Sequence, residues 1–137
     1  MVFIWNNDWA TGHPLIDEQH KQLFAAINAF LDTGTQGAST DRMLETLNFL
    51  NDYTIKHFFD EEQLQKKFQY PDYPRHREIH EALKANVRAL MSIFIRHGTS
   101  LQLTSRVKTE VGDWLVAHIK SEDQRVAAHI RSKELVH

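Results

Sequence analysis

Two polar residues, His57 and Glu61, interrupt the apolar stripe of a long helical segment predicted over residues 40–67. They are four residues apart, so both side chains project from the same face of the helix. That face is otherwise apolar, which places a carboxylate where a core residue is expected. Burying an unpaired carboxylate is unfavourable by several kcal/mol, or shifts its pKa until it is neutral. Glu61 therefore requires a chemical explanation.

Three explanations of Glu61 compete. The carboxylate could pair with a buried lysine or arginine, but no cationic residue falls on the predicted inner stripes. It could be protonated, but nearby imidazoles favour its anionic form. It could bind a metal ion, since histidine pairs four residues apart on a helix are a recurrent chelating arrangement. Metal binding is the explanation that accounts for all the inward polar residues together.

Four further histidines fall on the predicted inner faces of the other helices. His20 lies on the first stripe, His76 and His80 are four residues apart on the third, and His118 lies on the fourth. One inward histidine is more often a core residue than a ligand, whereas inward histidines on all four helices favour a shared metal site. Of the nine histidines, four look incidental: His13, His97, His129 and His137.

Asp123 is another candidate ligand, five residues after His118. At about 100° per residue, such a pair diverges by about 140° on a continuous α-helix, so both can face one site only if the helix breaks. The run from Ser121 to Gln124 fits the capping box S-x-x-E/Q, which predicts a break and a short C-terminal helix through about residue 130. The alternative is an ordinary acidic residue in the first turn of that helix, which the helix dipole favours. Spacing alone does not choose between the two.

The segments that must position these side chains are a tryptophan-bearing arm over about residues 1–15 and four amphipathic helices. Ser39 or Thr40 is expected to cap the second helix, and Gly98 to follow the third. No segment alternates with period two, so no strands are predicted. Four long helices with short connections predict an all-α, antiparallel up-down-up-down four-helix bundle. The predicted helices cover residues 17–33, 40–67, 74–96 and a fourth stretch from about 100–103 to 118.

The composition is that of an ordinary globular domain. With 137 residues, we expect one domain over residues 1–137. A net charge of −2 gives no broad basic surface for nucleic acid, and no stretch approaches the ~20 apolar residues of a membrane span. The absence of cysteine excludes disulfides and thiolate ligands. The first residues lack the features of a signal peptide, so a cytoplasmic location is expected.

Seven candidate ligands are too many for one ion, and two ions bridged by two carboxylates fit better. Two divalent ions, two carboxylates and a bridging hydroxide leave a single net positive charge, which a buried site tolerates. Imidazole and carboxylate suit iron, manganese and zinc alike. The ferritin-type pattern E-x-x-H occurs only as Glu134 to His137, so that kind of iron site is not predicted. The candidate ligands are His20, His57, Glu61, His76, His80, His118 and Asp123.

With these residues in view, the sequence resembles the hemerythrin family, specifically its bacterial hemerythrin-like domains. The matching stretches are IDEQHKQLFAAIN, HFFDEEQ, YPDYPRHREIHEAL and DWLVAHIKSED, together with the N-terminal arm. The resemblance covers essentially the whole chain and fills all seven family ligand positions in order. It implies two iron ions in a non-haem centre with an oxo or hydroxo bridge, bound by two histidine sets: His76, His80 and His118 for one ion, His20 and His57 for the other.

The same resemblance implies that Glu61 and Asp123 bridge the two ions and that the ion with two histidines keeps one position open. In the family that position takes dioxygen, so the implied function is reversible dioxygen binding for storage, delivery or sensing. An enzyme that handles peroxide or nitric oxide on the same scaffold is the alternative. Hemerythrin-like domains occur alone and fused to signalling modules, so a fused or partner signalling module stays open.

Apolar residues beside the ligands are expected to form the dry wall of an oxygen pocket, which would slow proton entry. Core packing explains the same residues, and both interpretations can hold. Glu62 is expected on the surface, and no further inward acid or base is seen that would drive turnover. We therefore expect a binding protein and not an enzyme. The predicted wall consists of Leu23, Phe24, Ile27, Phe58, Trp114, Leu115 and Ile119.

Overall fold

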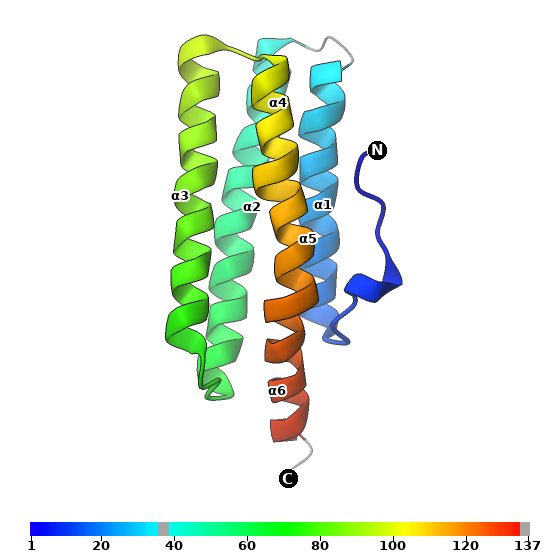
Figure 1. The fold of residues 1–137 in the computed structure, drawn as a ribbon, viewed down its shortest axis with the longest axis vertical. Helices are drawn as coiled ribbons and strands as arrows, with labels where there is room; N and C mark the ends of the chain where they lie inside the picture. The colour runs from blue at the N-terminus through cyan, green and yellow to red at the C-terminus, as the bar shows by residue number, and fades with distance from the viewer. Residues whose placement is uncertain (36–38, 135–137) are drawn as a thin grey trace.

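A computed structural model describes residues 1–35 and 39–134, which are helical almost throughout and contain no strand. Figure 1 shows four helical rods side by side, running alternately up and down, with the N-terminal arm along one side. The predicted all-α four-helix bundle is confirmed. In this part of the chain, every helix is too short or too polar to cross a lipid bilayer. The first three rods are α1 (Pro14–Thr35), α2 (Thr40–Lys67) and α3 (Tyr73–His97).

The helix ends follow local sequence signals. Ser39 caps α2, because its hydroxyl oxygen accepts a hydrogen bond of 3.2 Å from the Arg42 amide. Gly98 ends α3 with a φ of 75°, a conformation that glycine adopts without strain. α1 begins earlier than predicted because Pro14 is suited to the first position of a helix. The connection expected between the first two predicted helices includes residues 36–38, which lie outside the described residues.

The fourth rod is one continuous helix and does not break where a break was predicted. His118, Ile119 and Gln124 all have helical dihedral angles. Ser121 does not cap a new helix, since its hydroxyl donates 2.8 Å to the Ala117 carbonyl within the rod. The predicted break is therefore wrong. The rod consists of α4 (Leu101–Val107), the π-helical turn η2 (Lys108–Asp113), α5 (Trp114–His118), the π-helical turn η3 (Ile119–Asp123) and α6 (Gln124–Glu134).

The π-helical turn η3, and not a break, allows His118 and Asp123 to face the same site although they are five residues apart. Hydrogen bonds in a π-helix join residues five apart, so side chains at that spacing come onto nearly the same face. His118 and Asp123 have this spacing, and Nε2 of His118 lies 3.2 Å from Oδ1 of Asp123. Single π turns often occur at functional sites. The helix thus brings both residues to one site by widening a turn.

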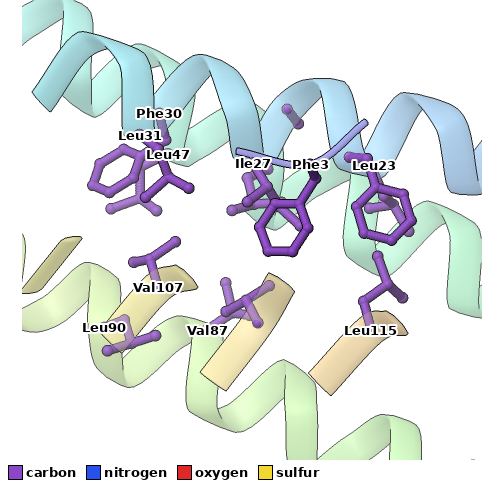
Figure 2. Packing of buried hydrophobic residues seen from close by; sticks show 14 of the residues in the cluster. Phe3, Leu23, Ile27, Phe30, Leu31, Leu47, Val87, Leu90, Val107 and Leu115 are labelled. Atoms are coloured by element: carbon purple, nitrogen blue, oxygen red, sulfur yellow. The ribbon is translucent and has the colours of Figure 1, made fainter. Parts of the chain in front are cut away.

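The core consists of two apolar clusters. The larger runs along the bundle, and Figure 2 shows Leu23 of α1 facing Leu115 of α5 within it. The smaller contains Ile16, Tyr70, Val126 and Ile130. On α1, His20 lies between Ile16 of the smaller cluster and Leu23 of the larger. The inward polar residues therefore separate the two clusters.

The N-terminal arm is fastened to the bundle by Phe3. The Asn28 side chain accepts a hydrogen bond of 2.9 Å from the Phe3 amide and donates one of 2.7 Å to the Phe3 carbonyl. The Phe3 ring lies against Gly112 in η2, and a Cβ at that position would collide with the ring. Trp9, in the short helix η1 (Asn7–Trp9), packs on Phe24 with ring centroids 4.8 Å apart. The arm thus covers α1 one turn beyond His20.

Candidate metal centre

The structure brings all seven candidate ligands into one buried cluster. They form two groups, in each of which one nitrogen or oxygen per residue lies within 4.8 Å of the others. Glu61 and Asp123 belong to both groups, and every member is at most 5% exposed. One group adds His76, His80 and His118, and the other adds His20 and His57.

The Glu61 carboxylate divides its oxygens between the two histidine sets. Oε1 lies 3.0 Å from Nε2 of His76 and 3.6 Å from Nε2 of His80. Oε2 lies 3.3 Å from Nε2 of His57 and 3.9 Å from Nε2 of His20. The Glu61 side chain therefore lies close to histidines of α1, α2 and α3.

Asp123 divides its oxygens in the same way. Oδ1 lies 3.3 Å from Nε2 of His76 and 3.2 Å from Nε2 of His118. Oδ2 lies 3.0 Å from Nε2 of His20. Two carboxylates with one oxygen toward each histidine set have the geometry that two bridged ions need.

Several inward atoms of the cluster are buried without a protein partner. Within the described residues, no hydrogen-bond partner is found for Nε2 of His20, Nε2 of His57 or either oxygen of Asp123. Nε2 of His118 also lies 3.3 Å from Nε2 of His80, so two nitrogens that could each be an acceptor face each other. Unpaired buried polar atoms are rare and unfavourable, by about 1–3 kcal/mol each. Metal ions would bind these atoms directly, so the residues present fit a metal centre.

The two buried carboxylates stay ionised. Burial and the charge of Asp123 raise the pKa of Glu61, but the close His57 and His76 rings outweigh both and lower it to about 2. Burial likewise raises the pKa of Asp123, but the charge of His118 and the closeness of the other histidine rings hold it well below its ordinary value. Both side chains are therefore anionic acceptors for a cation at neutral pH.

The histidines differ in how readily they give up a proton. Burial lowers the pKa of His57 and also that of His80, so both rings are neutral at physiological pH. Burial lowers the pKa of His76 as well, but the close carboxylates of Asp123 and Glu61 outweigh it and raise that pKa to about 9. In the metal-free protein, His76 therefore carries a proton across the neutral range.

Iron loading is expected to release protons and to become tighter as the pH rises. A histidine must be neutral to bind a metal ion, whereas His76 keeps its proton up to about pH 9 in the metal-free chain. Loading between pH 7 and 9 should displace this proton, so the apparent affinity should rise about tenfold per pH unit and level off above about pH 9. Anaerobic Fe(II) titrations at several pH values measure this, and an affinity independent of pH would contradict it.

Comparison with known proteins places this cluster in a family. The family model of the hemerythrin HHE cation binding domain matches residues 11–130, which contain all seven cluster residues. The chain belongs to the hemerythrin family. Its fold is similar to a crystal structure of wild-type hemerythrin, with a TM-score of 0.84, 29% identity, and coverage of 95% of this chain and 98% of that one.

Curated relatives extend the hemerythrin match. A bacteriohemerythrin of Pseudomonas aeruginosa (strain LESB58) is 31% identical over 120 residues, covering 88% of this chain and 76% of the relative. The myohemerythrin of Sipunculus nudus is 27% identical over 121 residues, covering 88% of each chain. The resemblance to hemerythrins seen in the sequence is therefore confirmed, while the metal-binding role of each residue stays a prediction.

Two buried side chains behind this hemerythrin cluster were not predicted. Glu62 is 8% exposed, and its Oε2 lies 2.8 Å from Nδ1 of His80, so the expectation that Glu62 lies on the surface is wrong. It is also an inward acid where none was expected. Gln19 is 4% exposed, and its Oε1 lies 2.8 Å from Nδ1 of His57. A histidine that binds a metal ion usually donates a hydrogen bond from its outer nitrogen to an acceptor. This rule predicts that such acceptors exist, but it does not identify the residues that supply them.

Aromatic rings cover two of the histidines. Phe58 stacks on His80 with ring centroids 3.8 Å apart, and Trp114 stacks on His118 at 4.5 Å. Of the seven predicted wall residues, six are buried and Trp114 is half-buried. These contacts keep water from that side of the cluster, and a role as oxygen pocket stays a prediction.

The histidines set aside as incidental lie outside the cluster among the described residues. Nε2 of His129 lies 2.7 Å from the Phe68 carbonyl oxygen, to which it donates. His13 contacts the Ile16 amide near the start of α1, at 3.4 Å. His97 is in the last turn of α3. His137, and with it the E-x-x-H pattern, lies outside the described residues.

Proposed function

We propose that this chain binds dioxygen reversibly at a non-haem di-iron centre. The main support for this proposal is the placement of the carboxylate oxygens. Glu61 and Asp123 each direct one oxygen to one histidine set and the second oxygen to the other set. Ions held at the two sets would share both carboxylates. Dioxygen is the ligand that the resemblance to hemerythrins implies, and family membership supports it.

In this proposal the two ions have different surroundings. Each ion would receive one oxygen from each carboxylate, but one would be held by three histidines and the other by two. The ion with fewer protein ligands keeps a position for a small molecule, as reactive metal sites require. When bound, two ferrous ions supply the electrons that a reversible gas-binding site needs. The ligand sets are His76, His80 and His118 for the first ion, and His20 and His57 for the second.

The surroundings of the proposed site favour binding over turnover. Leu23 and Leu115 face each other on the arm side of the bundle, and Phe58 covers His80, so apolar groups exclude water from the cluster. Among the described residues, the one further buried carboxylate is Glu62, which is held against the outer nitrogen of His80. It is therefore not placed to deliver protons repeatedly to a bound ligand. We infer a single oxygen-binding domain over residues 1–137.

Iron analysis after anaerobic reconstitution tests the metal content of this proposal. The chain is expected to retain about two iron ions after removal of excess Fe(II). A reproducible content of one ion or fewer would overturn the di-iron assignment.

A further inference from the structure

Two histidines of the cluster are held from behind by side chains of different charge. Glu62, an anion, contacts Nδ1 of His80 at 2.8 Å. Gln19, a neutral amide, contacts Nδ1 of His57 at the same distance. In both cases the partner lies on the far side of the ring from the carboxylates of the cluster, which face Nε2. The contacts can therefore control how each ring presents its inner nitrogen.

Glu62 determines the tautomer of His80. An ionised carboxylate can only accept hydrogen bonds, so Nδ1 of His80 must carry the hydrogen. In the neutral ring, Nε2 then has a free lone pair. Nε2 lies on the inner side, 3.6 Å from Oε1 of Glu61. His80 is thereby preset as a ligand before any metal arrives.

Gln19 determines the tautomer of His57, but it needs a further residue to do so. An amide can turn either its oxygen or its nitrogen toward the ring. The Gln19 nitrogen donates to Oδ2 of Asp60 at 2.7 Å, and Asp60 accepts from Nζ of Lys56 at 2.8 Å. Since the Asp60 carboxylate cannot donate, the Gln19 oxygen must face His57, and Nδ1 of His57 must donate to it. An ion pair near the surface thus selects the tautomer of a buried ring.

We infer that Glu62 and Gln19 are positioning residues of the metal centre, each acting on one ion. Glu62 acts through His80 on the ion with three histidines, and Gln19, oriented by Asp60, acts through His57 on the other. A carboxylate partner makes the inner nitrogen of an imidazole a stronger electron-pair donor to a metal ion than an amide partner does. The ion with three histidines is therefore held more tightly, by its partner as well as by its ligand count. The inference rests on the proposed function.

Nitrogen chemical shifts of the histidine rings test the positioning roles in the metal-free chain. In the wild type, His57 and His80 should both show the tautomer with hydrogen on Nδ1. Glu62→Ala should convert His80 to a mixture of tautomers and leave His57 unchanged, and Gln19→Ala should do the reverse. Rings that keep their wild-type tautomers in these variants would overturn the inference, whether or not the chain binds iron.

The matched variant for the remote residue is Asp60→Asn. An asparagine can donate as well as accept, so Gln19 loses the constraint on its orientation and His57 should become a mixture of tautomers. Asp52→Asn removes an exposed carboxylate from the same helix and should change neither ring. Equal effects of the two substitutions on His57 would contradict the role of Asp60.

Release of Fe(II) to a chelator tests which ion each residue serves. The wild type should release iron in a fast and a slow phase. Glu62→Gln, which keeps the side-chain shape, should accelerate the slow phase about 10- to 100-fold, and Gln19→Leu should accelerate the fast phase by a similar factor. Variants that change both phases equally, or neither, would overturn the assignment. A wild-type chain that retains no iron would instead refute the proposed function, while the tautomers would still decide the positioning roles.

Discussion

Glu61→Ala is expected to lower the iron content from about two ions per chain to one or none, with an affinity loss beyond the ~100-fold seen when an outer partner of a ligand is removed. The substitution takes one oxygen from each proposed ion and removes one of the two negative charges that offset them. It also leaves His57 and His76 without their carboxylate neighbour on α2. Iron analysis after anaerobic reconstitution measures the effect.

Loss of fold stability must be separated from loss of the bridge. Glu45→Ala removes an exposed glutamate from the same helix and should retain two ions. Glu61→Gln keeps the volume of the side chain but not its charge, and it should also lose iron while its helical circular dichroism stays at the wild-type level. Unchanged iron content in both Glu61 variants would exclude the bridging role.

Leu115→Ala is expected to speed autoxidation of the ferrous protein while iron remains bound. Leu115 is 2% exposed, faces Leu23 across the bundle (Figure 2) and lies on α5 together with His118. Truncation opens a cavity there and admits water and protons to the proposed gas-binding side. A rate increase on the order of tenfold needs the barrier to fall by only about 1.4 kcal/mol. Visible absorption in air-equilibrated buffer follows the reaction.

Leu103→Ala is the matched control for this cavity. Leu103 is also 2% exposed and lies in the same rod, but in α4, which the turn η2 separates from the α5 segment that carries His118. Both substitutions should lower the free energy of unfolding by about 2–5 kcal/mol. Only the change at Leu115 should alter the autoxidation rate, and equal rates in the two variants would count against a gating wall.

Much of the site could be predicted because its residues break a regular pattern. Five histidines and Glu61 occupy positions where helical periodicity demands an apolar residue, so the sequence alone marks six of the seven cluster residues. The same periodicity failed at His118 and Asp123, because it assumes a constant helical turn. A π turn contains about one residue more than an α-helical turn, so the side chains after it are shifted around the axis by one position. No local sequence signal distinguished such a turn from a capped break.

Glu62 and Gln19 could not be predicted because their burial depends on packing between rods. Glu62 lies about 100° round α2 from Glu61, at the edge of the inner stripe. It is covered because His80 of α3 lies against that edge and offers a hydrogen-bond donor. Gln19 is covered by the same kind of contact between α1 and α2. Periodicity describes one helix at a time and says nothing about such pairings.

The most direct test of dioxygen binding is an oxygenation cycle on the fully ferrous protein. Dioxygen is admitted to the anaerobic sample while its uptake and the visible spectrum are recorded, and it is then removed under inert gas. The proposed function predicts uptake of about one dioxygen per iron pair, a visible absorption band, and recovery of the colourless ferrous protein on removal. Continued dioxygen consumption in the presence of a reductant, or permanent oxidation in the first cycle, would contradict reversible binding.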